Sequence, residues 1–284
     1  MLLEEIETLL VLSEEQTMSR VGSRLYISQS AVSKRIAKLE KHLGKKLIHP
    51  DGRNIKLTPE AHHLIANVGP RFNEIRGLIS DQQVIQDETI IIIDCSETLV
   101  AGYLGELMGR YYQQDKYVSI TTHHTPVILE NVQGGRASIG FCAGHLPPQH
   151  NLRINHLFDE PFFVVSKHSL TSYPPGLLTI DLQNPVNMVQ ANVLQQNGIT
   201  PLMQMDSYSA AAKLALGGVA PALIPISVIK TLNIPKSHCF HFPFLDELRR
   251  PVHLCFRPSS YASPRVRNLI DQIAQTVRPI ASMP

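Results

Sequence analysis

The sequence has few cysteines and no long hydrophobic run, and each absence excludes a class of protein. The four cysteines are Cys95, Cys142, Cys239 and Cys255, and no two of them form a CxxC pair. This spacing argues against a disulfide framework and against a zinc ribbon, so we expect reduced thiols. No apolar stretch approaches the roughly 18 residues that a membrane span needs. The first fifteen residues are acidic rather than basic and signal-like, so we expect a cytoplasmic location.

Recognisable catalytic and metal-binding motifs are also absent. Gly44 and Lys45 resemble the end of a phosphate-binding loop, but Leu39 stands where the first glycine of that loop belongs. The sequence contains no GxSxG, HExxH or GxGxxG. Two histidine-containing groups come closest to a metal site, but neither has a known zinc spacing: Cys142, His145 and His150, and His238, Cys239 and His241. We expect no catalytic activity, no metal and no cofactor.

The positive charge of the chain is concentrated near its start. With 284 residues the chain is long enough for two domains of about 100 to 200 residues each. Residues 17–58 hold ten Lys and Arg side chains against two acidic ones, whereas residues 1–15 hold five glutamates. A local basic patch attracts polyanions, nucleic acid first among them, although a solvated helix face can carry the same charge. The arrangement of the basic residues has to decide between these readings.

Residues 28–43 predict a helix with one apolar and one cationic face. Ser28 can cap its start, Gly44 can end it, and Val32, Ile36 and Leu39 fall on one stripe of the helical wheel. Small hydrogen-bonding side chains near a helix start suit base edges in the major groove, and lysines further along suit phosphates. The residues expected to contact DNA are Gln29 near the start of the helix and, on the face opposite the stripe, Ser30, Ser33, Lys34 and Lys38.

The segments on either side of this helix complete a winged helix-turn-helix. A helix with leucines at helical spacing starts the chain, and a short helix that Ser19 can cap ends near Leu25. After Gly44, two short apolar segments flank the turn-forming residues 50–52 and predict a β-hairpin. The tip of that hairpin offers Arg53 to a groove or a phosphate.

These segments resemble the DNA-binding signature of LysR-type transcriptional regulators. The resemblance implies that Gln29, Ser30, Ser33 and Lys34 meet the major groove and that Arg53 serves the wing. The resemblance also implies that the protein catalyses no reaction and that its partner is double-stranded DNA with an inverted-repeat operator. The matching residues are Arg24-Leu25, the run 28–33, Leu39-Glu40, Leu43-Gly44, Leu47, Arg53 and Leu57-Thr58, and the departures from the usual pattern are Gly22, Ile48 and Pro50.

A linker helix is expected from Pro59 onward. Its apolar residues recur at alternating steps of four and three, which is the seam of a helix that pairs with another. Pro70 should kink it, because proline removes a backbone donor and clashes with the preceding turn. In the LysR-type family the corresponding helix pairs two subunits, so we expect a homodimer or homotetramer, with no membrane contact. The seam residues are Ala61, Ile65, Val68, Phe72, Ile75 and Ile79.

The remainder of the chain alternates between strand and helix patterns, which is typical of an α/β domain with parallel strands. Predicted helices lie near 99–114, 127–133, 209–216 and 264–277. Predicted strands span 89–94, 118–122, 138–142, 162–166, 187–190, 202–205, 222–226 and 252–256.

The resemblance implies a two-lobed effector domain like a periplasmic binding protein, and the full prediction has three parts. Residues 1–58 form the winged helix-turn-helix, 59–88 the linker helix and 89–284 the effector-binding domain. The chain is expected to cross between lobes near 159–161 and to return near 257–258. Lobe I then comprises 89–160 and 259–284, and lobe II comprises 161–258.

Ligands of such sheets bind beyond the carboxyl ends of the strands, in the cleft between lobes. The expected side chains carry mostly hydroxyl and amide groups, and no arginine among them could clamp a carboxylate, which leaves an uncharged or aromatic effector open. The residues expected to contact a small-molecule effector are Ser96, Thr98, His124, Thr125, Cys142, Gln190 and Asn192.

Two other functions remain open at this point. Cys95 and Cys142 are both expected at strand ends that face the cleft, so a thiol-based redox sensor could replace the effector. Small buried hydrophobic side chains are the commoner role of such cysteines. A metabolite-binding protein without a DNA function would keep the second domain and use the first for dimerisation, but the cationic face of helix 28–43 argues against it.

Overall fold

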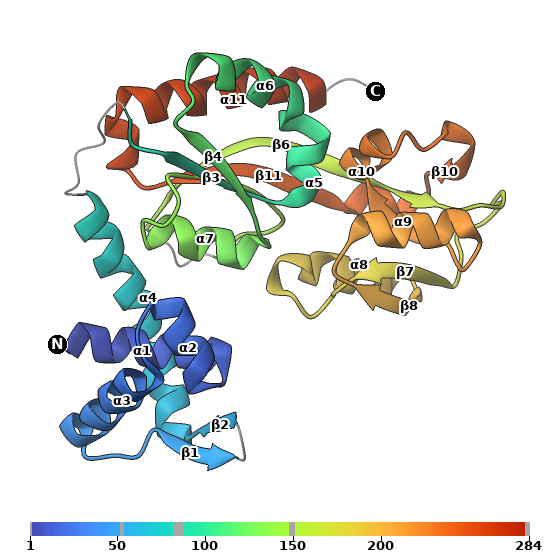
Figure 1. Cartoon of the computed structure of the whole chain (residues 1–284). Coiled ribbons are helices and arrows are strands. Elements are labelled where there is room, and N and C mark those ends of the chain that lie inside the picture. Colours follow the sequence, from blue (N-terminus) through green and yellow to red (C-terminus); the bar gives the residue numbers. More distant parts are fainter. Residues whose placement is uncertain (1, 52–53, 82–87, 148–150, 282–284) are drawn as a thin grey trace. The chain divides into compact units, whose positions relative to one another are not determined.

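The computed structural model describes residues 2–51, 54–81, 88–147 and 151–281 and divides into two compact units (Figure 1). The first unit is Met1–Arg76 and the second is Gly77–Pro284. No helix in the described part of the chain is both long and apolar enough to cross a lipid bilayer.

The first unit starts with three helices, α1 (Leu2–Glu15), α2 (Met18–Leu25) and α3 (Gln29–Leu43). Helix α3 begins and ends as predicted, because the Ser28 hydroxyl accepts a hydrogen bond from the Ala31 N–H (3.2 Å) and Gly44 has a left-handed φ of +63°. Helix α2 begins earlier than predicted. Its capping hydroxyl belongs to Thr17 rather than Ser19, and it accepts from the Arg20 N–H at 3.4 Å.

The apolar stripe of α3 lies in the core of the first unit. Val32, Ile36 and Leu39 are almost completely buried and pack with side chains from α1 and α2. The hairpin follows as predicted, with β1 (Ile48–Asp51) antiparallel to β2 (Asn54–Leu57). Its tip, residues 52–53, lies outside the described residues, so the wing role of Arg53 stays a prediction.

The linker helix is α4 (Pro59–Asp81), and it continues through Pro70. Thr58 starts it, because the Thr58 hydroxyl accepts from the Ala61 N–H (3.1 Å) and donates to the Lys46 carbonyl (2.9 Å). Part of the predicted seam is used inside the chain itself, since Ala61 and Phe72 are buried. Further along α4, Ile75, Leu78 and Ile79 are 42%, 60% and 56% exposed, so the second half of the helix carries an apolar surface open to a partner.

One nine-stranded mixed sheet organises the described part of the second unit, in the order β4-β3-β5-β11-β6-β9-β7-β8, with β10 paired to β6. Strand β6 is long enough to join two lobes, because residues 153–161 pair with β11 and residues 162–165 pair with β9. The strands are β3 (Ile91–Cys95), β4 (Val118–Thr122), β5 (Ile139–Ala143), β6 (Arg153–Val165), β7 (Gly176–Ile180), β8 (Thr200–Met205), β9 (Ala222–Pro225), β10 (Cys239–Phe240) and β11 (Arg249–Phe256).

Helices cover this sheet and divide it into two hydrophobic cores. In lobe I, α6 and α11 lie together on one face of the sheet and α7 lies on the other (Figure 1). In lobe II, α8, α9 and α10 surround β7, β8 and β9. The helices are α5 (Glu97–Leu99), the π-helical turn η1 (Val100–Leu104), α6 (Gly105–Gln114), α7 (Thr125–Gln133), α8 (Met188–Gln196), α9 (Tyr208–Gly217), α10 (Ile226–Thr231) and α11 (Pro264–Ala281), with 3-10 turns η2 (Pro185–Asn187), η3 (Lys236–His238), η4 (Pro243–Glu247) and η5 (Ser260–Ala262).

Two of the differences from the sequence-based prediction in the second unit bear on the site. Residues 187–190 lie in η2 and α8 instead of a strand, and the strand of that region is β7, which was not predicted. The return of the chain to lobe I was predicted near 257–258, but it occurs earlier. Strand β11 pairs with β5, and Val252 and Leu254 belong to the core of lobe I, so the crossing lies at the beginning of β11.

Gly140 in β5 allows α7 to pack closely on the sheet. A Cβ at this position would overlap with the Cys255 Sγ and would lie 2.8 Å from a methyl carbon of Ile128. We therefore expect Gly140→Ala to lower the free energy of unfolding by about 1 to 3 kcal/mol through overpacking. Gly109→Ala is the matched control, because nothing lies within 4 Å of its Cβ position in α6. Urea titrations should show the control equal to or more stable than the parent; equal stability of both variants would contradict the packing argument.

Candidate nucleic-acid interface and ligand pocket

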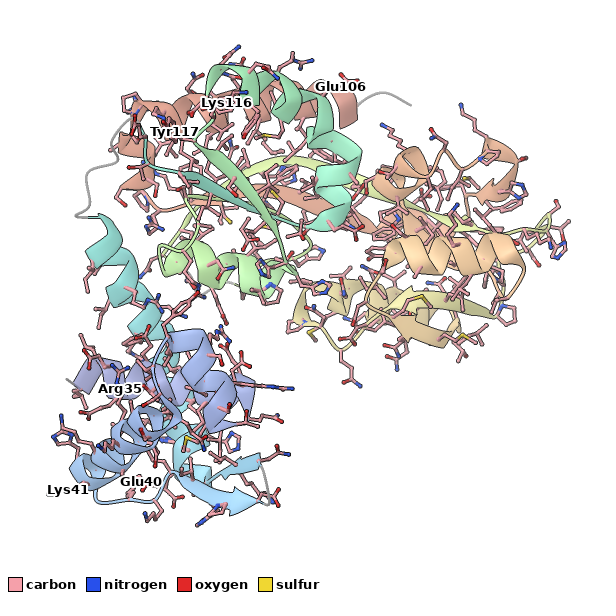
Figure 2. All side chains as sticks on the ribbon, viewed as in Figure 1. Arg35, Glu40, Lys41, Glu106, Lys116 and Tyr117 are labelled. Atoms are coloured by element: carbon pink, nitrogen blue, oxygen red, sulfur yellow. The ribbon has the colours of Figure 1, made fainter. Side chains whose placement is uncertain are left out.

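The cationic face of α3 is open to solvent. All five side chains on α3 that the sequence nominates for DNA contact are exposed, and a further lysine, Lys41, lies near the end of the helix (Figure 2). The apolar stripe on the other side of the helix packs into the core, so most of the exposed face is not needed for packing and can contact a partner. The exposed candidates are Gln29, Ser30, Ser33, Lys34 and Lys38.

Lys38 has a structural contact that the sequence did not predict. Its ammonium group lies 2.9 Å from the Glu5 carboxylate, whose side chain is only 1% exposed, and His42 Nδ1 lies 3.1 Å from the other oxygen of that carboxylate. The hydrogen bond from Lys38 is the main cause that lowers the pKa of Glu5, against the effect of burial, and His42 adds to it. Lys38 therefore fixes α3 to α1, in addition to any contact with DNA.

Glu40 holds the hairpin against α3. One carboxylate oxygen accepts hydrogen bonds from the Leu47 N–H (2.8 Å) and the Ile48 N–H (3.4 Å), and the other is 2.8 Å from the Lys46 ammonium. Burial alone would raise the pKa of Glu40, but the hydrogen bonds from Lys46 and from the two backbone groups lower it below its usual value. Glu40 was expected only as part of the sequence signature, and the structure shows its role as the acceptor that positions the wing.

A cavity of about 530 Å³ lies between the lobes of the second unit. This volume is within the range of sites that hold small organic ligands. The lobe I wall is the start of α5 and the segment from β4 into α7, and the lobe II wall follows β7 and β8. The carboxyl ends of parallel strands therefore line the cavity from both sides, as the topology rule requires.

Four of the seven predicted effector contacts line this cavity: Ser96, Thr98, His124 and Thr125. The Thr125 hydroxyl is already engaged, because it donates to the Ala143 carbonyl at 2.8 Å. Ser96 precedes α5 without capping it through its side chain. The sequence therefore located these four residues on the lobe I wall, and their contact with an effector stays a prediction.

The other three predicted contacts do not line the cavity. Cys142 is completely buried under α7. Asn192 is exposed on α8, and Gln190 is buried behind the wall, where its amide donates to the Tyr208 hydroxyl at 3.0 Å. The last two were misplaced because residues 187–190 form a turn and a helix rather than a strand that ends at the cleft.

An arginine lines the cavity, contrary to the sequence-based expectation. Arg250 is 6% exposed, and its Nε lies 3.0 Å from the Glu160 carboxylate. Its Nη2 donates to the Thr98 hydroxyl at 2.7 Å, and its guanidinium carbon lies 5.5 Å from the ring centre of Tyr208. Arg250 lies at the start of β11, which runs antiparallel to its neighbours. The amino end of β11 therefore lies at the same edge as the carboxyl ends of the parallel strands. The sequence-based prediction considered only carboxyl ends and so missed Arg250.

Glu160 completes a buried polar network at the crossing between lobes. Its carboxylate also accepts from the Ser227 N–H at 2.7 Å and from the Tyr103 hydroxyl at 3.2 Å. Burial, followed by the charge of Glu160, raises the pKa of Tyr103, so its hydroxyl stays protonated and donates. Ser227 belongs to lobe II and Tyr103 to lobe I, so one carboxylate ties both lobes to the guanidinium in the cavity.

The lining also carries carboxylates. Asp181 directly follows β7, Asp206 directly follows β8, and Glu97 lies in α5. Two histidines, His123 and His124, stand on the lobe I wall, and His123 Nδ1 lies 2.8 Å from the buried Asp94 carboxylate. The cavity therefore presents one guanidinium and several carboxylates, a polar lining that suits a charged ligand better than an aromatic one. Within the described residues, no group of three or more His, Cys, Asp or Glu side chains has the geometry to hold a metal; His150 of one predicted group lies outside them.

Each of the two units matches a known protein family. Residues 3–62 match the family described as "Bacterial regulatory helix-turn-helix protein, lysR family", and residues 86–278 match the family described as "LysR substrate binding domain". The chain belongs to the LysR family of transcriptional regulators. One relative, an uncharacterized HTH-type transcriptional regulator of Vibrio cholerae, is 60% identical over 98% of this chain and 97% of its own length. A probable RuBisCO transcriptional regulator of Trichormus variabilis is 26% identical over 92% and 84%.

Solved structures of LysR-type proteins share the fold of this regulator. A full-length OxyR variant from Pseudomonas aeruginosa superposes with a TM-score of 0.61 at 19% identity, covering 99% of this chain and 96% of the other. An OxyR mutant of Corynebacterium glutamicum gives a TM-score of 0.55 at 19% identity, covering 98% and 91%. At these identities the likeness establishes the fold alone.

The cysteines of this regulator do not have the environment expected for a redox sensor. Cys95 and Cys142 are both buried and lie in different cores, on opposite faces of the sheet, and neither lines the cavity. Burial, reinforced by the charge of Asp94, raises the pKa of Cys95. The hydrogen bond with Cys142, followed by burial, raises that of Cys255. Since neither Cys95 nor Cys142 lines the cavity, the expectation that these cysteines face the cleft is wrong.

Proposed function

We propose that this LysR-family regulator reads an operator with the exposed face of α3 and that a small molecule in the cavity between the lobes changes its activity. The observation that carries the first half is the division of α3 into a buried apolar stripe and an exposed cationic face. Gln29, Ser30 and Ser33 are short or hydrogen-bonding and lie in the first two turns, where a recognition helix meets base edges. We assign Lys34 to the major groove and Lys38 to the phosphates. We assign Arg53 to the contact that the wing makes with DNA.

An exposed apolar surface on α4, suited to self-association, supports the proposal that α3 reads an operator. An inverted-repeat operator needs two winged helices related by a two-fold axis. The exposed apolar side chains Ile75, Leu78 and Ile79 on α4 supply a surface for pairing, and a dimer or tetramer built on α4 would bury them. A chromosomal operator would place the protein in the cytoplasm.

The effector half of the proposal depends on the cavity between the lobes. An effector can shift a regulator between two arrangements only by its different affinity for each. The Glu160–Arg250 pair connects both lobes to the cavity, so a ligand that contacts Arg250 also contacts the crossing between the lobes. Closure of the lobes around a ligand would supply the required difference.

The base-reading role of α3 can be tested with Gln29→Ala. We expect the variant to lose about 1 to 3 kcal/mol of discrimination between its operator and unrelated DNA, because one base contact is removed. The measurement is a fluorescence titration against an operator selected from random duplexes and against a scrambled duplex, at several salt concentrations.

Lys41→Ala is the matched control for this experiment. Lys41 is exposed near the end of the same helix, so its loss should weaken binding to both duplexes alike and reduce the salt dependence. Lys38→Ala is a poorer control, since it also removes a partner of Glu5. Equal losses on both duplexes from Gln29→Ala would reject the base-reading assignment, and salt-insensitive binding to every sequence would reject the regulator itself.

A further inference from the structure

Besides the exposed Glu97 and two histidines, the charges that line the cavity come in two groups on different elements. Arg250 stands at the start of β11 together with Thr98 of α5, whereas Asp181 and Asp206 stand at the ends of β7 and β8. Among the described residues no ion pair joins either aspartate to a Lys, Arg or His. Arg250 has its own counter-ion in Glu160. The positive and the negative group are thus each available to a ligand.

The positive group is built to accept an anion. Arg250 is fixed by Glu160 and by the ring of Tyr208, yet a guanidinium carries more N–H donors than these contacts and the Thr98 contact use. The Thr98 hydroxyl accepts from Arg250, so its own hydrogen is left to donate. Ser96 adds a second hydroxyl that does not cap a helix. Two hydroxyls beside a buried guanidinium suit a carboxylate.

The negative group is placed to receive a cation. Strands β7 and β8 are parallel neighbours, and Ile180 pairs with Met205. Asp181 and Asp206 are the next residues along each strand, so their backbones are separated by roughly one strand spacing, about 5 Å. One oxygen of Asp181 accepts a hydrogen bond from the Gln183 N–H at 2.9 Å, so its other oxygen and the exposed Asp206 carboxylate are left to attract a positive charge placed between them. Both line the cavity, so a ligand is in position to supply that charge.

We propose that the ligand of this cavity is an amino acid, with its carboxylate on Arg250 and Thr98 and its ammonium group on Asp181 and Asp206. This inference rests on the proposed effector function and specifies its chemistry. A simple carboxylic acid would leave the two aspartates uncompensated, and a simple amine would leave the donors of Arg250 and Thr98 unused. The side chain of the amino acid would meet the remaining lining, which includes Ile180 and Val186.

Thermal shifts of the full chain with each of the twenty proteinogenic L-amino acids test this proposal. We expect at least one of them to raise the melting temperature, and calorimetry on that compound to show binding at least ten-fold tighter than on its deaminated acid and on its decarboxylated amine. The proposal is overturned if none of the twenty binds, if either analogue binds as tightly, or if Mg²⁺ or Ca²⁺ alone stabilises the protein in their place.

Variants separate the two halves of the site. Asp206 is exposed, so Asp206→Asn should fold normally, weaken the amino acid at least ten-fold and leave the affinity for the deaminated acid unchanged. Thr98→Val should weaken both compounds. Glu106→Gln, which removes a carboxylate that is 96% exposed on α6, is the control and should change neither. Equal weakening of both compounds by Asp206→Asn would contradict the assignment of the ammonium group.

Operator binding, measured on the same preparation, keeps this inference distinct from the proposed function. If the protein binds its operator and responds to a compound of another class, the amino-acid assignment fails and the regulator stands. If no operator is bound and an amino acid still binds with the stated selectivity, the proposed DNA function fails and the ligand assignment stands.

Discussion

Glu160→Ala should lower the free energy of unfolding of the second unit by about 3 to 5 kcal/mol, because it leaves the Arg250 guanidinium buried without its counter-ion. The substitution also removes the acceptor of the Ser227 N–H and of the Tyr103 hydroxyl. The chain has no tryptophan, so unfolding in urea is best followed by circular dichroism and by hydrogen exchange of peptides from β6 and β11.

The neighbouring carboxylate provides the control for Glu160. Asp159 lies on the same strand, its side chain is 51% exposed, and it forms an ion pair with the half-exposed His156. Because such a surface pair contributes little, Asp159→Ala should lower the free energy of unfolding by less than about 1 kcal/mol. A double variant, Glu160→Met with Arg250→Met, should recover most of the lost stability, since it removes both buried charges. Equal costs for Asp159→Ala and Glu160→Ala would show that the buried pair contributes nothing special.

The elements that could be predicted from the sequence are those with a strong local pattern. Helix α3 has a capping serine, a terminal glycine and a clean apolar stripe, and all three signals act within the segment itself. Strand β4 was predicted with its exact bounds for the same reason. Segment 187–190 has no such signal, because its apolar residues suit a short strand or a short helix. In the structure it lies in η2 and α8, where Gln190 donates a hydrogen bond to the Tyr208 hydroxyl.

The cavity residues that the sequence predicts are likewise those that follow strands with a clear local pattern. Ser96, Thr98, His124 and Thr125 follow strands that the sequence predicts, so the topology rule finds them. Asp181 follows β7, which was not predicted, and Arg250 begins an antiparallel strand, whose pairing with β5 and β6 depends on contacts far away in the chain. The pair Arg249-Arg250 ahead of an apolar strand was the available signal, but only the register shows which arginine is buried.

Glu40→Ala should destabilise the first unit by about 2 to 3 kcal/mol. It leaves the N–H groups of Leu47 and Ile48 without the charged acceptor that they share, and Leu47 is almost completely buried. The loss should appear first in the hairpin, as faster hydrogen exchange at the Leu47 amide than at amides in α1. Glu60→Gln, at the exposed start of α4, is the control and should cost no more than about 1 kcal/mol.

The contribution of Glu40 should also depend on pH with a definite sign. The folded chain lowers the pKa of this carboxyl below its ordinary value of 4.5, so the stabilisation is fully present above that value and is lost as the pH falls through the folded pKa. Other carboxylates of the unit titrate in the same range, Glu5 among them, so the informative quantity is the difference in stability between the parent and Glu40→Gln. That difference should be constant from pH 7 to about pH 5 and should shrink below pH 4.5. A difference that grows on acidification would mean that the folded state favours the protonated carboxyl, and the wing would then be held by something other than the ionised Glu40.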